Sequence, residues 1–494
     1  MDGSLGEGEG RPKTPWPLPP GDWPSREEAR KALLFQPIQM GSLTLHRRTW
    51  VPAMVPWRAT EEGFVTEANI DWYGRFARGR PAVLVLEATG IRDIPSGPLL
   101  RISHDRFLPG LARIVERVRK ESGGETKLLI QILDFLRIRR RPVPRVYFER
   151  FFELKRCHRE RIRALAPKAA ALPEGELRRW LAAQTQDRLS SILDPREFQD
   201  LVYGARENVG DLQFPWIRDL PQSLPPLFAR AAARAREVGF DGVELHYAHA
   251  YTMAQFLSRT NQRDDGYGGS PQARLRLPLE VIAAVRSEVG EDYTLGCRML
   301  GDEVIPGGSR IQDACDYAEA FARAGLHFLS ISKGGKFEDA KPPRIGEAAY
   351  PYTGPSGHEC MPTTRIAAPG PWSRNVPLAA SIRKQIHAKL SPQQPKPLVV
   401  TAGGICSFSQ AETILQTEQA DLIASARQSL ADPDWFLKME QGQGPSIRRC
   451  TFTNYCEGLD RRHKEVTCKL WDRLFKPGDP VPLSRDQKRR LLPP

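Results

Sequence analysis

Two histidines and a tyrosine, His246, His249 and Tyr251, follow directly on the apolar run GVEL. On a helix, the spacing of the histidines would place both rings on one face, where they could bind a metal ion. The preceding residues FDGVEL are strand-like, however, and the chain contains no HExxH motif. At the end of a strand, the two imidazoles can converge on a ligand oxygen and polarise it as negative charge develops. Because Tyr251 can supply a proton, the trio predicts a site that polarises and protonates a small molecule.

Two stretches near the C-terminus could hold a phosphate group. TAGGI (401–405) and ADLIASARQSLADP (420–433) each begin in or follow an apolar run. Gly403 and Gly404 permit a close approach of the backbone to a ligand, and Arg427 can pair with a phosphate through two parallel hydrogen bonds. The loops that follow the seventh and eighth strands of a β/α barrel are a common phosphate site. We therefore expect a phosphate-bearing cofactor at this end of the chain.

A scaffold must bring these residues together, and the apolar pattern indicates which one. Eight short runs read as strands: TWVPAMV (49–55), AVLVLEA (82–88), KLLIQIL (127–133), GVELHYA (242–248), TLGCRML (294–300), FLSIS (328–332), PLVVTAG (397–403) and ADLIASA (420–426). They are continuously apolar, as strands buried on both faces should be. Helical patterns fill most gaps, at 66–79, 108–120, 223–238, 272–289, 311–324, 377–389, 408–417 and 433–440. Eight β/α units predict an α/β fold of the (β/α)8 TIM barrel type, with a doubly wound open sheet as the alternative.

The domain organisation follows from composition and loop length. Residues 1–30 are rich in Gly, Pro and charge and are expected to form a disordered N-terminal arm. The barrel is expected over 31–445, interrupted after its third strand by a large helical, basic insert at 137–222. An insert of this length exceeds ordinary loops, so we expect a lid or a substrate wall. Residues 446–494 form a cysteine-containing C-terminal extension.

Charge and composition limit the possible partners. The chain of 494 residues has a net charge of +13, and 137–163 carries eleven Lys and Arg against three Glu. That stretch is either a polyanion-binding patch or, as we prefer, a solvated helical insert with its apolar residues turned inward: Phe148, Phe151, Phe152 and Leu154. No apolar run is long enough to span a membrane. Eight cysteines are too few for a disulfide framework, and no secretory signal is visible, so a reduced, cytoplasmic protein is expected.

From LFQPIQMGSLTLHRR (34–48) to about Gly442, the chain resembles the Old Yellow Enzyme family of FMN-dependent ene-reductases. The most specific parts are GFDGVELHYAHAYTMAQFLS and RDDGYGGS, and the branch that contains dienoyl-CoA reductases is included in the resemblance. The resemblance implies FMN in a (β/α)8 barrel, hydride transfer from NAD(P)H to the flavin, and reduction of an activated C=C bond. The expected partner is then a small-molecule alkene, without a membrane or a nucleic acid.

The resemblance also implies individual roles. His246 and His249 would hold an oxygen of the substrate, Tyr251 would protonate its α-carbon, and Gln131 and Arg298 would bind the pyrimidine edge of the flavin. The flavin ring would further contact Pro52, Ala53, Met54, Val55 and Ala88, and its phosphate would contact Gly403, Gly404, Ala426 and Arg427.

Three positions depart from the family pattern, and one of them is Ala426, which stands where glycine is usual in the Gly-Arg pair that holds the phosphate. Val55 stands where a Thr or Cys usually bonds the flavin O4, so the flavin potential should differ. Asp134 replaces an expected His at the point where the insert begins, which leaves the substrate specificity open.

The C-terminal stretch RRCTFTNYCEGLDRRHKEVTC (448–468) bears on metal binding. Cys450, Cys456 and Cys468 match the first, third and fourth cysteines of the C-x2-C-x2-C-x11-C iron–sulfur pattern of the dienoyl-CoA branch. Thr453 stands at the second. The preferred interpretation is a cysteine segment without metal; an incomplete iron–sulfur cluster, or zinc bound with His463, are the alternatives. For the whole chain, the alternatives are a polyanion-binding barrel and a metal-dependent hydrolase that uses His246 and His249.

Overall fold

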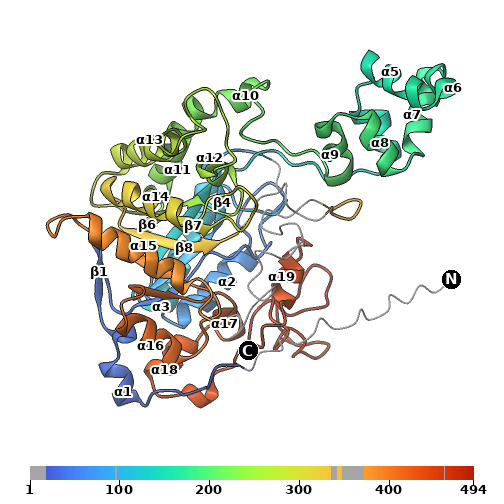
Figure 1. The fold of residues 1–494 in the computed structure, drawn as a ribbon. Helices are drawn as coiled ribbons and strands as arrows, with labels where there is room; N and C mark the ends of the chain where they lie inside the picture. Colours follow the sequence, from blue (N-terminus) through green and yellow to red (C-terminus); the bar gives the residue numbers. More distant parts are fainter. Residues whose placement is uncertain (1–17, 95–96, 335–341, 348–371, 461) are drawn as a thin grey trace.

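The computed structural model describes residues 18–94, 97–334, 342–347, 372–460 and 462–494. Eight parallel strands close into a barrel in the order β10-β3-β4-β5-β6-β7-β8-β9 (Figure 1). Their bounds are β3 Thr49–Val51, β4 Val83–Gly90, β5 Lys127–Leu133, β6 Gly242–Tyr247, β7 Thr294–Asp302, β8 Phe328–Lys333, β9 Leu398–Thr401 and β10 Leu422–Ala424. All eight predicted strands are present, and closure of the sheet rules out the open-sheet alternative.

The strand register sets which side chains are neighbours at the barrel's C-terminal rim. Gln131 on β5 pairs with Glu244 on β6, and His246 on β6 pairs with Arg298 on β7. Because parallel strands run in the same direction, residues near their carboxyl ends meet at one end of the barrel. The three polar residues expected at strand ends, Gln131, His246 and Arg298, therefore lie side by side.

Helices surround the barrel and bury its outer face. Those that follow strands are α2 Glu67–Arg78, α3 Leu108–Ser122, α11 Leu220–Glu237, α13 Pro271–Val289, α14 Ile311–Arg323, α15 Val376–Lys389, α16 Phe408–Gln416 and α18 Trp435–Glu440. They match the helical patterns of the sequence. Shorter helical segments are η2 Asp105–Phe107, α10 Pro215–Arg218, α12 Thr252–Leu257, α17 Arg427–Ala431 and η5 Gly444–Ser446. Of these, α12 and α17 were not predicted, and both begin directly after predicted site residues.

The N-terminal segment is more ordered than its composition suggested. Residues 1–17 of the arm predicted for 1–30 lie outside the described residues. Helix α1 (Arg26–Lys31) starts at a capping box, in which the Ser25 hydroxyl accepts from the Glu28 backbone N–H and the Glu28 carboxylate accepts from the Ser25 N–H. Ala29 packs into a cluster with Trp435 of α18. The 3-10 turn η1 (Leu33–Phe35) and the hairpin of β1 (Ile38–Met40) and β2 (Leu43–Leu45) then lead into the barrel.

The insert forms a helical lobe that stands away from the barrel (Figure 1). It contains α4 Pro144–Val146, a π-helical turn Tyr147–Phe151, α5 Arg156–Leu165, α6 Pro167–Ala170, α7 Glu174–Ala182, α8 Gln186–Ile192 and α9 Pro195–Tyr203. These pack around their own apolar cluster, which includes Phe148 and Phe152. Contrary to the prediction, Phe151 is 43% exposed and lies under the Arg139 guanidinium.

Of the insert predicted as a lid or substrate wall, Ile138 and Arg140 line the cavity at the barrel end, whereas no residue of 144–203 does. Two antiparallel segments join the lobe to the barrel: Arg139 N–H donates to the Ala205 carbonyl at 2.7 Å, and Glu207 N–H donates to the Arg137 carbonyl at 3.0 Å. A lobe with its own core is stable without covering the barrel. Residues 144–203 of the lobe therefore lie apart from the barrel rim. The two connecting segments reach that rim.

The C-terminal extension packs against the segment that follows β3. It contains α19 (Tyr455–Asp460), and Val466 N–H donates to the Pro56 carbonyl at 3.0 Å. The buried Arg58 side chain donates to the carbonyls of Val466 (3.0 Å) and Leu491 (2.7 Å). Burial lowers the pKa of Arg58 to about 9, while Glu465 and Glu87 oppose that shift. The extension is thus an integral wall of the barrel end, and no helix among the described residues has the length and apolarity to cross a bilayer.

Candidate active site

A cavity of about 810 Å³ opens at the C-terminal ends of the barrel strands. This volume is within the range of about 300–1,000 Å³ found for cofactor and ligand sites. All fourteen residues predicted to bind the flavin or substrate line it: Pro52, Ala53, Met54, Val55, Ala88, Gln131, His246, His249, Tyr251, Arg298, Gly403, Gly404, Ala426 and Arg427. The structure therefore brings together residues that the sequence spreads over the whole barrel.

The loop between β6 and α12 presents the His–His–Tyr trio to this cavity. His246 lies in β6, and Tyr251 is the N-cap of α12. Between them, His249 and Ala250 adopt left-handed backbone conformations with φ of 59° and 60°. Such conformations are strained for residues other than glycine and persist where surrounding contacts impose them. The turn places the ring of His246 5.2 Å from that of His249 and 5.1 Å from that of Tyr251, measured between centroids.

Burial fixes the protonation of the trio. It lowers the pKa of His246 to about 3, and the positive charge of Arg298 adds to the shift. The pKa of His249 lies well below its usual range for the same reasons. Burial, and then Asp460, raise the pKa of the Tyr251 hydroxyl. At neutral pH the imidazoles are therefore uncharged hydrogen-bond donors, and the tyrosine keeps its proton until a ligand takes it.

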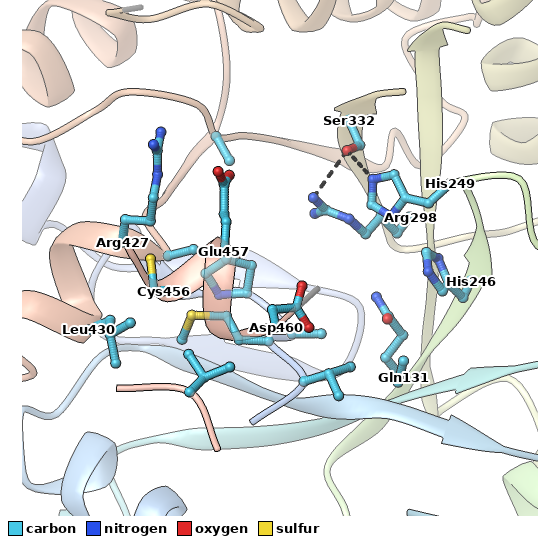
Figure 2. Close-up of a pocket in the computed structure, with 18 of the residues that line it drawn as sticks. Gln131, His246, His249, Arg298, Ser332, Arg427, Leu430, Cys456, Glu457 and Asp460 are labelled. Atoms are coloured by element: carbon cyan, nitrogen blue, oxygen red, sulfur yellow. Dashed lines mark hydrogen bonds between the residues drawn. The ribbon is translucent and has the colours of Figure 1, made fainter. Parts of the chain in front are cut away.

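His246 lines the cavity, and one of its ring nitrogens has no hydrogen-bond partner among the described residues. His249 Nε2 lies 2.7 Å from the Ser332 hydroxyl, which also accepts from Arg298 Nη2 at 3.1 Å. His246 Nδ1 is buried and has no hydrogen-bond partner among the described residues. Figure 2 shows His249 and Arg298 both turned toward Ser332, with His246 and Gln131 on the same side of the cavity. A polar ring in a cavity wall that lacks a full set of protein partners is suited to hold a ligand oxygen.

A second set of polar groups lies beside the trio, on β5, β6 and β7. Gln131 donates from its Nε2 to the Glu244 carboxylate at 2.5 Å, so its amide oxygen is left for a ligand. Arg298 donates from Nη1 to the Ser330 hydroxyl at 3.1 Å. An amide oxygen and a guanidinium side by side match the donors and acceptors of a flavin pyrimidine edge. Burial raises the pKa of Glu244, and the charge of Arg298 opposes that shift.

The opposite side of the cavity has the features of a phosphate site. Gly403 and Gly404 have φ of 112° and 74°, and a Cβ on Gly403 would lie 3.1 Å from the Asn375 amide nitrogen. The backbone N–H groups of Gly403, Gly404, Ala426 and Arg427 donate to no group among the described residues. The Arg427 guanidinium lies over the Phe452 ring at 4.4 Å and donates to Asn454 Oδ1 at 2.8 Å. Free backbone N–H groups beside a guanidinium bind phosphate, so the residues present fit FMN from pyrimidine to phosphate.

Several cavity residues were not predicted from the sequence. Trp57 lies two positions beyond the predicted strand 49–55 and stacks on His463 with centroids 4.0 Å apart. Its Nε1–H donates to Asp460 Oδ1 at 2.6 Å. Both partners come from the C-terminal extension, and no sequence pattern links them to Trp57. Ser332 ends the sixth predicted strand, and that position alone could have identified it as a rim residue.

The three cysteines predicted as candidate metal ligands are not gathered as a metal site. Cys456 lines the cavity, whereas Cys450 packs beside Phe452 and Cys468 in an apolar cluster. In the part of the chain that the structure describes, no group of three His, Cys, Asp or Glu residues is placed to hold a metal ion. Burial raises the pKa of all three thiols, to about 12 for Cys468. The ligand sets of the iron–sulfur and zinc alternatives are thus not assembled among the described residues, where the thiols pack against apolar side chains.

Comparisons of the sequence with known proteins identify a matching family model and several relatives. A family model described as the NADH:flavin oxidoreductase / NADH oxidase family matches residues 222–354 and 370–444. An NADH oxidase of Thermoanaerobacter brockii is 29% identical over 426 residues, which are 85% of this chain and 52% of that protein. The chain thus spans about half the length of the curated relatives it matches.

Solved structures resemble the chain in fold. A 2-naphthoyl-CoA reductase complex has a TM-score of 0.64 at 19% identity, covering 91% of this chain and 58% of that one. An Old Yellow Enzyme homologue from Zymomonas mobilis has a TM-score of 0.51 at 21% identity, covering 82% of this chain and 91% of that one. At these identities the likeness supports the barrel fold alone.

Proposed function

We propose that this chain, which the NADH:flavin oxidoreductase / NADH oxidase family model matches over 222–354 and 370–444, is an FMN-dependent oxidoreductase that uses NAD(P)H to reduce an activated C=C bond of a small molecule. One observation carries the proposal. The residues suited to a pyrimidine edge, a phosphate, a substrate oxygen and a proton transfer all line the same cavity. His246 lines that cavity, and its buried Nδ1 has no hydrogen-bond partner among the described residues.

The chemistry divides between the cofactor and the protein. When bound, FMN supplies hydride transfer from NAD(P)H to the β-carbon of the alkene. The neutral imidazoles of His246 and His249 would donate hydrogen bonds to the carbonyl oxygen conjugated with that alkene, where negative charge develops. Tyr251, whose pKa is raised by burial, would give its phenolic proton to the α-carbon.

The other cavity residues would position the cofactor. Gln131 and Arg298 would hold the pyrimidine edge, where the guanidinium favours added negative charge. Pro52, Ala53, Met54, Val55 and Ala88 would contact the flavin ring system. Gly403, Gly404, Ala426 and Arg427 would hold the phosphate through backbone N–H groups and one guanidinium. Substrate and cofactor would thus use different strands of one barrel.

Two other functions have less support. The insert's arginines largely bond within the lobe, as in the pairs Arg145–Glu149, Arg156–Glu160 and Arg178–Glu174, which weakens the polyanion-binding alternative. A hydrolase that uses His246 and His249 would need a further metal ligand, and the described residues supply no such group.

The proposal is tested by the visible spectrum and the two half-reactions. We expect the purified protein, reconstituted with FMN, to show flavin absorbance and to release FMN on denaturation. NADH or NADPH should then bleach the flavin without oxygen, and 2-cyclohexenone should restore its colour. Protein that stays colourless after reconstitution, or flavin that neither nucleotide reduces, would contradict the proposal.

A matched pair of variants separates the substrate site from the cofactor site. His246→Asn should slow reoxidation by the enone while leaving reduction by NAD(P)H within a few fold. Arg427→Gln should instead weaken FMN binding, because it removes the guanidinium at the phosphate end. If both variants affected the same step equally, the assignment of the two ends of the cavity would be wrong.

A further inference from the structure

Asp134, one of the residues at which the chain departs from the pattern of the family it resembles, lies buried beside the loop that carries His249 and Tyr251. It follows β5, and its side chain is 1% exposed. Arg92 donates to both of its oxygens, from Nε to Oδ1 at 2.5 Å and from Nη2 to Oδ2 at 3.0 Å. The bidentate pair neutralises a carboxylate that would otherwise be costly to bury.

The same carboxylate reaches the start of α12. The Thr252 hydroxyl donates to Asp134 Oδ2 at 2.5 Å, and the Thr252 backbone N–H donates to the Asp134 carbonyl at 3.3 Å. Thr252 is the first residue of α12 and follows Tyr251 directly. Asp134 therefore holds the residue next to Tyr251 through both its side chain and its backbone.

The segment held in this way is strained. His249 and Ala250 are both left-handed, with φ of 59° and 60°. One restraint comes from within the segment, since Gln255 Nε2 donates to the Ala250 carbonyl at 2.9 Å. The Asp134 contacts come from a different strand and fix the end of the strained turn relative to the barrel wall. Consecutive left-handed residues of this kind need such external contacts to persist.

We infer that Asp134, paired with Arg92, is a positioning residue that holds Thr252 so that the left-handed turn keeps His249 and Tyr251 aimed into the cavity. The expected effect on reoxidation rests on the proposed function. The expected effect on the conformation of the loop does not. Asp134 does not line the cavity, so it acts through Tyr251 and His249 rather than by touching substrate.

The kinetic test is a double-mutant cycle on the FMN-loaded protein. Asp134→Asn should slow reoxidation by 2-cyclohexenone at least tenfold and change reduction by NAD(P)H less than twofold. The same substitution should then be made in the Tyr251→Phe variant. There, the factor by which Asp134→Asn slows reoxidation should be less than half of the factor found in the parent, because the phenol that Asp134 positions is gone. Equal slowing of both half-reactions, or full additivity with Tyr251→Phe, would overturn the inference.

A matched control and a milder variant keep the test sharp. Asp93→Asn removes a neighbouring aspartate that is also ion-paired, to Arg106 at 2.6 Å, but does not contact the loop. It should leave both half-reactions unchanged. Thr252→Val removes only the hydroxyl bond and should reproduce part of the Asp134→Asn effect, which keeps the test valid if Asp134→Asn folds poorly.

A measurement independent of activity separates this inference from the proposed function. Hydrogen exchange of the flavin-free protein should be faster in the peptide 248–257 for Asp134→Asn than for the parent, and unchanged for Asp93→Asn. Unchanged exchange in that peptide would refute the positioning role even if the enzyme were active. If the parent bound no FMN, but exchange in the peptide 248–257 were still faster in Asp134→Asn than in the parent, only the proposed function would be refuted.

Discussion

Gln131 Nε2 donates a 2.5 Å hydrogen bond to the carboxylate of Glu244, its register partner on the next barrel strand. Glu244 is fully buried, and its second oxygen has no hydrogen-bond partner among the described residues. The bond fixes which end of the Gln131 amide faces the cavity, since only the NH2 group can donate to the carboxylate. The orientation of the Gln131 amide, which would contact the flavin, is thus set by Glu244, which does not line the cavity.

Glu244→Gln should change the reduction potential of bound FMN. Removing an ionised carboxylate near Arg298 leaves the guanidinium's charge less compensated, which favours the reduced flavin. We expect the potential to rise by roughly 20–40 mV, or about 1–2 kcal/mol for two electrons. Because burial raises the pKa of Glu244, the difference from the parent should grow as the pH rises and the carboxyl ionises.

Spectroelectrochemical titration at several pH values measures this shift. Glu87→Gln is the control, since Glu87 is an equally buried barrel carboxylate that accepts from the Tyr73 hydroxyl at 2.7 Å and does not line the cavity. The reduction potential of FMN bound to Glu87→Gln should match that of FMN bound to the parent. A Glu244→Gln potential that equals the parent's at every pH would show that Glu244 has no electrostatic effect on the flavin.

The buried His246 should make folding stability depend on pH. Its pKa is lowered to about 3 in the folded protein, against about 6.5 in the unfolded chain. Between these values the unfolded chain binds the extra proton, so the folded state loses stability as the pH falls below about 6.5. The loss from His246 at pH 5 should be about 2 kcal/mol.

Urea unfolding of the flavin-free protein at pH 7 and pH 5 tests this expectation. His246→Asn should lose about 2 kcal/mol less than the parent between the two pH values. His46→Asn, a substitution of an exposed histidine, controls for the loss of an imidazole as such. Identical losses in the parent and His246→Asn would mean that His246 is not held neutral in the folded protein.

Val55→Thr should raise the potential of bound FMN. Val55 lines the cavity and offers no side-chain hydrogen bond, whereas a threonine of similar shape adds a hydroxyl donor. A hydrogen bond that is stronger to the reduced flavin is worth about 0.5–1.5 kcal/mol, or roughly 10–30 mV. The same titration measures it, with Val65→Thr, away from the cavity, as control. An unchanged or lower potential would place Val55 out of reach of the flavin's oxygens.

Replacing 144–203 by a short Gly–Ser linker should leave FMN binding within twofold of the parent. The lobe has its own apolar cluster, and none of these residues lines the cavity. The two connecting segments already lie side by side through the Arg139–Ala205 hydrogen bond of 2.7 Å. Fluorescence titration with FMN measures the dissociation constant.

A deletion of 446–494 provides the contrast to the lobe deletion. That segment supplies Phe452, Asp460 and His463 to the cavity wall and covers the buried Arg58, so its loss should abolish FMN binding. Loss of binding on removal of the lobe, with binding kept on removal of the extension, would reverse the roles assigned to these two additions.

The sequence alone determined the barrel and fourteen of the residues that line the cavity. Continuous apolar runs such as KLLIQIL and GVELHYA identify parallel strands because both their faces are buried. Once eight such strands close, the residues at their carboxyl ends meet in one place whatever the loops do. Gln131, His246, Arg298 and Gly403 could therefore be placed from their positions in the chain, and their family resemblance named the cofactor they suit.

Only the tertiary structure decided how the additions sit and what holds the catalytic loop. The stacking of Trp57 on His463, the anchoring of Thr252 by Asp134 and the outward direction of the lobe all depend on contacts between segments far apart in the chain. Such contacts leave no periodic signal, because each rests on one side chain meeting another through the closed barrel. The same holds for Cys450, Cys456 and Cys468, whose spacing left a metal-free segment, an iron–sulfur cluster and a zinc site all open; in the described part of the chain they pack among apolar side chains and no group of three His, Cys, Asp or Glu is placed to hold a metal ion.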